Sequence, residues 1–296
     1  MTIAETPPQT QKSTDWPSIL QLGLSLFGML SLWGMALASW QTGIFQLFNS
    51  GIETGLPVAS TSNSLGIFTL GLLLLPSAAL AAMRIAGYNP HDNPNFERLN
   101  NLIRPGLLMY LFPIILIVAS FIITQANWIS ALLSPLFVIA AALPILWLLW
   151  LGKRDLQAGS PQRQWGLFAS ALTLGPLIII VLELILIIIG VIFAVIFYAG
   201  NLTEIGDTFQ VDPNVIASDP ELINEIAARI IEEPIALIAT LLYLSFFIPL
   251  IEELFKPIGV WIIGFRKPSP AQGFTAGMIS GAAFAVFENF TRAPTP

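Results

Sequence analysis

Long apolar runs separated by shorter polar stretches follow one another along almost the whole chain. A membrane-spanning helix needs about 20 mostly apolar residues, because each residue rises ~1.5 Å through a hydrocarbon layer ~30 Å thick. Seven runs meet this length, and we predict a transmembrane helix for each. Their approximate bounds are residues 18–40, 64–86, 105–123, 129–151, 165–199, 235–264 and 271–290. The predicted fold is therefore all-α, that of a polytopic helical membrane protein.

The polar stretches between these runs alternate in charge. The loops after the second, fourth and sixth runs carry Lys and Arg, whereas those after the first and third carry none. By the positive-inside rule, we expect the basic loops and the amino terminus on the cytoplasmic side. Residues 201–233 hold eight acidic side chains and one Arg, and we expect this segment on the outer side, with a short amphipathic helix over 219–233.

This pattern divides the chain into four parts. We expect residues 1–16 to form a cytoplasmic polar tail and residues 17–200 to form five transmembrane helices. Residues 201–234 are the acidic extracytoplasmic loop, and residues 235–296 are predicted to form a helical hairpin.

Composition narrows the classes of function. Apolar residues make up 55% of the chain and charged residues 10%, against about 25% charged residues in soluble domains, which excludes a soluble enzyme. The chain has no cysteine, so disulfides, thiolate metal sites and a cysteine nucleophile are excluded. The apolar runs make the lipid bilayer the expected partner. Lys and Arg are not clustered, so we expect no binding of nucleic acid. The single histidine, His91, falls in a polar loop and is interpreted as a solvated residue. No pattern defines an oligomeric state.

Four carboxylates fall inside the predicted spans: Glu183, Glu252, Glu253 and Glu288. A charge at the centre of a spanning helix costs about 2.5–3.5 kcal/mol even on lenient scales, which makes these acids candidate functional groups. Lys256 follows Glu252 by four residues, the favoured spacing of a helical ion pair. Two hypotheses stay open for Glu183, a protonated acid bonded to a neighbouring helix or a contributor to the site.

The last run carries a row of small residues in line with Glu288. The row repeats every fourth residue and consists of Gly273, Gly277, Gly281 and Ala285. Glu288 follows Gly281 by two helical turns and so lies on the same side of the helix. Such a row lets a second helix approach closely, and we call it the glycine ridge. We expect the sixth and seventh runs to fold back on each other along it.

This hairpin would bring Glu288 and Asn289 to Glu252 and Glu253. Carboxylates a few ångströms apart cannot all stay ionised in a low dielectric, and a divalent metal or shared protons would relieve their repulsion. A metal-activated water beside a free carboxylate is a common means of peptide hydrolysis. Pro257 is expected to bend the helix here, because it cannot donate a hydrogen bond to the carbonyl of Glu253.

Two motifs in this part of the chain resemble those of a known family. Residues 252–256, Glu-Glu-Leu-Phe-Lys, fit an EExxK motif, and residues 281–289 fit a small-residue FxxxEN motif. Their order and spacing are similar to those of the PrsW family of intramembrane metalloproteases, which is related to the CAAX-processing and bacteriocin-processing membrane proteases. The resemblance implies an integral protein of a bacterial inner membrane that cleaves membrane protein or peptide substrates with a divalent metal, zinc by expectation.

The resemblance also implies roles for individual residues. Glu252, Glu253 and Lys256 would be catalytic, with a glutamate as general base and Lys256 as charge partner or oxyanion stabiliser. Glu253 and Glu288 would bind the metal, and Asn289 would be a hydrogen-bonding neighbour. Which of Glu252 and Glu253 acts as base and which as ligand stays open. Catalytic zinc normally takes three protein ligands including histidine, and the family carries a histidine motif on a later helix. We therefore expect this chain to lack carboxy-terminal helices of the full family fold.

Two other functions compete with the protease. Glu183, Glu252 and Glu288 could relay protons or cations in a membrane transporter. A noncatalytic scaffold that binds helices through the glycine ridge is the other alternative. Neither explains why both motifs occur in this order, so the sequence favours the protease.

Overall fold

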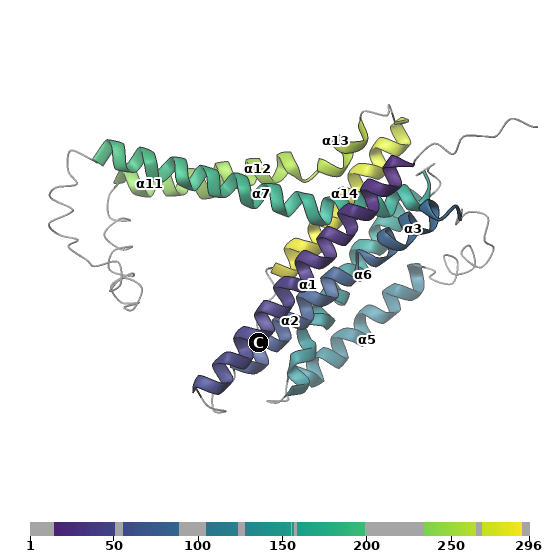
Figure 1. Ribbon diagram of the computed structural model, residues 1–296, viewed down its shortest axis with the longest axis horizontal. Coiled ribbons are helices and arrows are strands. Elements are labelled where there is room, and N and C mark those ends of the chain that lie inside the picture. The colour runs from purple at the N-terminus through teal and green to yellow at the C-terminus, as the bar shows by residue number, and fades with distance from the viewer. Residues whose placement is uncertain are drawn as a thin grey trace, which may run out of the picture. The chain divides into compact units, whose positions relative to one another are not determined.

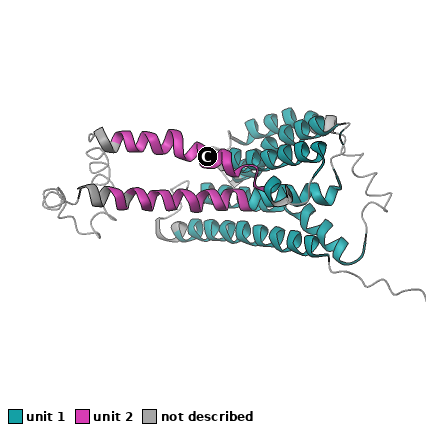
Figure 2. Cartoon of the chain, turned by 90° about the horizontal axis from the view of Figure 1, so that it is seen from above, with its two compact units in different colours: residues 1–173, 259–296 teal, residues 174–258 magenta. Residues whose placement is uncertain are grey.

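The computed structural model describes residues 15–50, 56–88, 105–123, 128–154, 156, 159–198, 234–264 and 268–291. Across these residues the chain is helical and contains no β-strand, which confirms the all-α prediction. The chain forms two compact units, coloured separately in Figure 2: unit 1 comprises Met1–Thr173 and Gly259–Pro296, and unit 2 comprises Leu174–Ile258. His91, the helix expected over 219–233 and the basic turn at residues 266–267 fall outside the described residues.

Unit 1 is a bundle of long helices (Figure 1). It contains α1 (Trp16–Ser50), α2 (Leu56–Leu72), α3 (Leu75–Ile85), α5 (Pro105–Ile123), the 3-10 segment η2 (Trp128–Leu132), α6 (Leu133–Lys153), the first part of α7 (Pro161–Tyr198), most of α13 (Ile258–Gly264) and α14 (Pro270–Thr291). Helix α1 packs along α2 and α3, and α6 packs against α2, α5 and α14. A turn separates α2 from α3 because Pro76, near the start of α3, has no N–H for the preceding turn.

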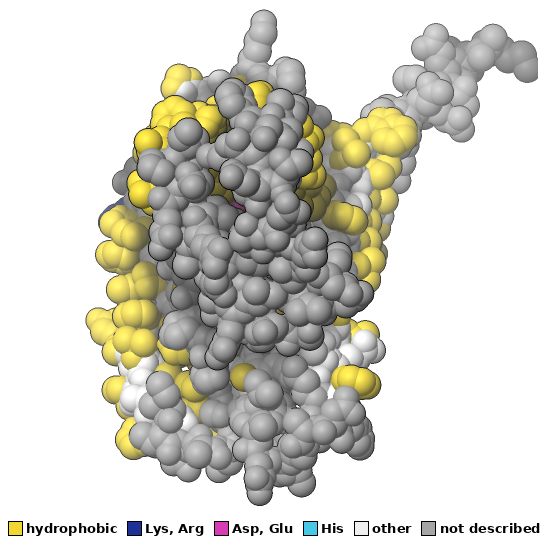
Figure 3. Space-filling view, turned by 90° about the vertical axis from the view of Figure 1, so that its left-hand side faces the viewer, with side chains coloured by type: hydrophobic (Ala, Val, Ile, Leu, Met, Phe, Trp, Pro, Cys, Tyr) yellow, Lys and Arg dark blue, Asp and Glu magenta, His cyan; other side chains and the backbone are white. Residues whose placement is uncertain are grey.

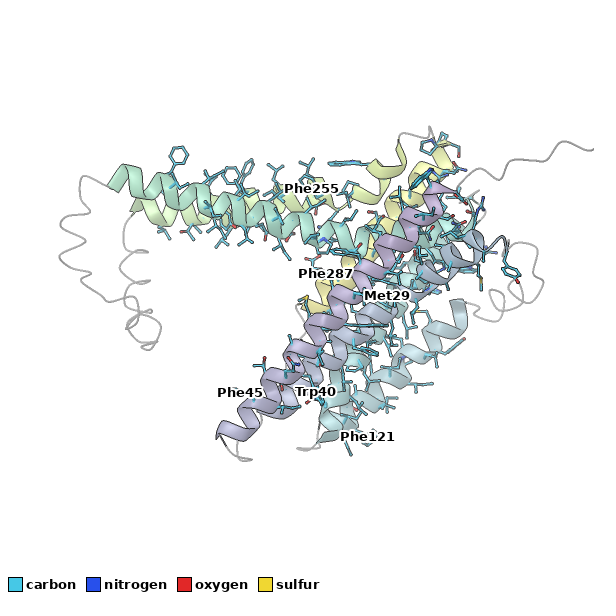
Figure 4. All side chains as sticks on the ribbon, viewed as in Figure 1. Met29, Trp40, Phe45, Phe121, Phe255 and Phe287 are labelled. Atoms are coloured by element: carbon cyan, nitrogen blue, oxygen red, sulfur yellow. The ribbon has the colours of Figure 1, made fainter. Side chains whose placement is uncertain are left out.

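The core of unit 1 lies where α1, α2, α6, α7 and α14 meet. It includes Met29, Leu70, Val138, Leu172 and Ile279, all buried. Many large apolar side chains point outward instead, such as the labelled Trp40, Phe45 and Phe121 (Figure 4). Figure 3 shows hydrophobic side chains along the margins of the face in view. An outer surface of this kind suits contact with lipid tails rather than water.

Five helical segments among the described residues are long and apolar enough to cross a membrane. They are Trp16–Phe45, Ala59–Ile85, Leu133–Lys153, Pro161–Gly190 and Leu237–Trp261, and Met109–Ile122 is a shorter apolar helix. With α14, these helices occupy the seven places predicted from the sequence. Helix α14 has 22 residues but is less apolar, because it includes Gln272, Glu288 and Asn289. The chain is an integral membrane protein.

A cluster of hydrogen-bonded polar side chains joins α1, α3 and α7 inside unit 1. Gln21 Nε2 donates to Ser77 Oγ at 3.0 Å and to the backbone carbonyl of Gln162 at 3.1 Å. Ser25 Oγ donates to Ser77 Oγ at 2.9 Å, and Gln162 Nε2 donates to Ser18 Oγ at 2.7 Å. The three serines are buried. A shifted register would leave buried polar groups unpaired, so the cluster fixes which helix faces meet.

Asp15, just before α1, extends this cluster to the surface and predicts a pH effect. Burial raises the pKa of Asp15, but hydrogen bonds from Ser18 and Arg84 and the positive charge of Arg84 outweigh it, so the pKa is lowered. A carboxyl whose pKa is lower in the folded state stabilises the fold above its unfolded pKa, and this stabilisation is lost as the pH falls through the folded pKa. The pair is partly exposed, which limits the stabilisation to about 1 kcal/mol or less.

We therefore expect Asp15→Asn to lower the unfolding temperature at about pH 7 and to have no effect near pH 2, where the wild-type carboxyl is protonated as well. Thermal unfolding in detergent at both pH values measures this difference. A deficit of equal size at both would show that the charge of Asp15 contributes nothing.

Unit 2 consists of the second part of α7 and the segment that returns alongside it (Figures 1 and 2). The returning segment comprises α11 (Pro234–Leu242), the π-helical η3 (Tyr243–Phe247) and α12 (Ile248–Phe255). Two side chains favour the π-helical turn. Ser245 Oγ donates to the carbonyl of Leu241, and Pro249 has no N–H to donate one turn back. Helix α7 remains a continuous helix through Pro176.

Candidate active site

The first motif lies where α12 ends. Glu252 and Glu253 are in the last turn of α12, and Lys256 caps it, with its N–H donating to the carbonyl of Glu252 at 2.8 Å. Helix α13 begins at Ile258, after a turn at Lys256 and Pro257. The predicted interruption at Pro257 is thus confirmed, and its cause is the missing proline N–H.

Lys256 forms an ion pair with Glu253. Its Nζ lies 2.5 Å from Glu253 Oε1, and the Glu253 side chain is 71% exposed. The spacing of four residues predicted Glu252 as the partner, and the structure shows a pair at a spacing of three. Both spacings place side chains on one helix face, so the pair with Glu252 stays a prediction. The structure thus shows an ion pair between the lysine and the second glutamate of the EExxK motif.

Unit 2 also brings Glu183 of α7 to Glu252. The two carboxyl groups are close enough to interact electrostatically. Tyr243, the first residue of η3, donates its hydroxyl to the backbone carbonyl of Glu183 at 3.5 Å. Two carboxylates that lie close together repel, and a proton or a cation between them relieves this repulsion. Both hypotheses for Glu183 stay open.

The sequence patterns alone did not point to Tyr243. A tyrosine within an apolar span is nevertheless informative, because a tyrosine hydroxyl removed from water usually finds a hydrogen-bond partner. The partner could not be predicted, since α7 and η3 are more than 40 residues apart in the chain.

The second motif lies on α14, in unit 1. Glu288 is half-buried and Asn289 is exposed, with its Nδ2 donating to the carbonyl of Ala285 at 2.8 Å. Part of the hydrogen-bonding capacity of Asn289 therefore serves its own helix. The residues of the first motif belong to unit 2, and the meeting of the two motifs stays a prediction from the sequence.

The glycine ridge is not the face through which α14 packs inside unit 1. Helix α14 is buried through Thr275, Ala276, Ile279, Ala283 and Val286. By helical spacing these residues lie on the side opposite the ridge, whereas Ser280 and Phe284, which are also buried, lie beside it. Apart from the adjacent residues and backbone of α14 itself, no described atom lies within 4 Å of a Cβ built at any of the three ridge glycines. Glu288, in line with the ridge, is likewise on the side away from the packed face.

The donor chemistry of these residues suits a divalent cation, because carboxylate oxygens bind such ions. A carboxylate can accept a hydrogen bond at one oxygen and bind a cation with the other, so the ion pair of Glu253 is compatible with metal binding. Among the described residues, however, no three His, Asp or Glu side chains come together closely enough to hold a metal. A complete ligand set is therefore not present there.

Comparison with known proteins agrees with the motifs. Residues 164–293 match the model of the PrsW-protease family, described as PrsW family intramembrane metalloprotease. The matched region runs from α7 through α14, so it contains both motifs and extends well beyond residues 252–289, which they span. No curated protein and no solved structure matches the chain.

Proposed function

Because residues 164–293 belong to the PrsW family of intramembrane metalloproteases, we propose that this protein is an endopeptidase that cleaves membrane-associated proteins within or beside the lipid bilayer. The observation that carries the proposal is the placement of Glu252, Glu253 and Lys256 at a helix end, with Glu253 and Lys256 joined in an ion pair. The family match favours this function over the transporter and the scaffold.

In the proposed reaction, Glu252 is the general base. It takes a proton from a water molecule as the water oxygen attacks the carbonyl carbon of the peptide bond. It then gives this proton to the nitrogen that leaves when the C–N bond breaks.

Glu253 and Glu288 are the proposed ligands of a divalent metal, which we expect to be zinc. When bound, the metal would activate the water and polarise the peptide carbonyl. Lys256 holds the Glu253 carboxylate through the ion pair, and in this role it orients the ligand. Asn289 is the proposed hydrogen-bonding neighbour of Glu288. The proposed location is a bacterial inner membrane, with the amino terminus on the cytoplasmic side.

Cleavage in liposomes by the purified full-length protein, with the later helices that the family resemblance implies, tests this function. The substrate is a single-span peptide with a fluorophore and a quencher on opposite sides of the scissile region. We expect cleavage that a chelator abolishes and that added zinc restores, because the family is one of metalloproteases. Cleavage that a chelator leaves unchanged would contradict the metal, and absence of cleavage with ion uptake into the liposomes would support the transporter.

A further inference from the structure

Phe290, which follows the second motif directly, occupies a space that only glycine leaves open. A Cβ built at Gly66 in α2 would lie 2.6 Å from Phe290 Cε2, 3.2 Å from Phe290 Cζ and 2.9 Å from Ser134 Cβ. Carbon atoms without a bond between them do not approach so closely. Gly66 of α2 and Ser134 of α6 therefore form a notch that receives the ring of Phe290, and we call it the Gly66 notch.

The two sides of the Gly66 notch are tied to each other. Ser62 Oγ and Ser134 Oγ share a hydrogen bond of 2.8 Å, and the backbone N–H of Ser134 points to Ser62 Oγ at 3.4 Å. Both serines are buried. Because Ser62 lies one turn before Gly66 on α2, this bond fixes the start of α6 beside the glycine. The notch is thus a rigid feature of unit 1.

A second close approach holds α14 farther toward its amino terminus. Met278 lies over Gly152 of α6, where a Cβ would be 2.9 Å from the Met278 sulfur. Met278 and Phe290 are separated by about 18 Å along the helix axis. Two contacts this far apart, with buried Ala283 and Val286 between them, determine both the height and the rotation of α14 in unit 1.

From this geometry we propose that the Gly66 notch positions Glu288. Residues two apart in a helix project about 200° from each other, so a Phe290 ring seated in the notch directs Glu288 to the opposite side of α14. Gly66, Ser134 and Phe290 act through Glu288 and are positioning residues. This inference rests on the proposed function in that Glu288 belongs to the active site.

The first test follows the direction of position 288 without using activity. The chain has no cysteine, so Glu288→Cys provides a single thiol whose rate of maleimide labelling reports its access to solvent. We expect Gly66→Ala to change this rate by about threefold or more, because the added methyl displaces the ring. Phe290→Leu, introduced together with Gly66→Ala, is expected to restore the original rate.

Gly71→Ala is the matched control. Gly71 lies on the same helix, and its Cβ would be 2.6 Å from Trp33 Nε1 and 2.8 Å from Trp33 Cδ1. The substitution therefore crowds an aromatic ring as tightly, but that ring belongs to α1 and not to α14. We expect labelling at position 288 to stay unchanged in this background. Equal changes in both backgrounds would overturn the proposal, since they would indicate general loosening of the bundle.

The second test measures cleavage in liposomes. We expect Gly66→Ala to lower kcat about tenfold with little change in KM, because misplacing a group by about 1 Å can cost as much as 100-fold. Phe290→Leu should recover most of this loss, and Gly71→Ala should keep the wild-type kcat. Unchanged labelling in Gly66→Ala would refute the positioning role. Altered labelling with unchanged cleavage would uphold the role of the notch in orienting α14 and refute the assignment of Glu288 to the active site.

Discussion

Glu252→Gln is expected to lower kcat for peptide cleavage by about 10²–10⁴-fold, the usual contribution of a general base. Glutamine has the size and shape of glutamate and still accepts hydrogen bonds, but it cannot take a proton from water. Glu252 lies in the last turn of α12, and glutamine fills the same volume there, so the substitution opens no cavity. Cleavage of the single-span peptide in liposomes measures the loss, with circular dichroism as the check on folding.

Glu253→Gln is the matched comparison, since it makes the same chemical change at the adjacent residue. It also removes the charge that pairs with Lys256. If Glu253 binds the metal, its loss should be offset in part by more metal, whereas the loss in Glu252→Gln should not respond to metal. A response of both variants, or of Glu252→Gln alone, would reverse the roles. Undiminished cleavage by both would refute the protease.

Glu288→Gln is expected to lower cleavage by about 10²-fold or more and to weaken metal binding, because a neutral amide replaces the proposed carboxylate ligand. The effect should appear both as lost activity and as a higher zinc concentration for half-maximal cleavage. Cleavage that recovers in part at saturating zinc would indicate that Glu288 is a metal ligand, because added zinc can compensate for a weakened metal site. Cleavage that does not recover would indicate a proton-transfer group.

Asn289→Ala provides the graded control for that result. Residues that hydrogen-bond to a metal ligand typically contribute about 10–100-fold to affinity or activity. Asn289 already donates to the carbonyl of Ala285, so we expect an effect at the lower end and smaller than that of Glu288→Gln. An equal or larger effect would show that the amide, and not the carboxylate, is the principal group of the second motif.

The helices were predictable because a spanning helix must be both long and apolar. The expected span at 105–123 coincides with α5, and the bounds of α7 differ from the prediction by a few residues at the start. Length and hydropathy do not define irregular turns, however. The π-helical η3 depends on Ser245 and Pro249 within an otherwise apolar run, and helical spacing alone could not predict it.

The candidate site was predictable in part. The interruption at Pro257 followed from proline chemistry, and the close spacing of Lys256 to the two glutamates limited its partners to these residues. Contacts between distant segments were not predictable in the same way. The approach of Glu183 to Glu252 and the seating of Phe290 at Gly66 depend on how helices far apart in the chain are rotated against each other. A single sequence does not define which faces of two distant helices contact each other.

The π-helical turn before Glu252 also affects how related chains should be compared. A π-helical turn contains about one residue more than an α-helical turn, and such turns often mark functional sites. A relative that lacked one residue within 243–247 could keep a continuous helix, yet α11 would then be turned relative to α12 by about 100°. Alignments of this span should therefore place any one-residue gap at Tyr243–Phe247. The lipid-facing residues before the gap and the acidic motif after it are then each aligned with residues on the same helix face.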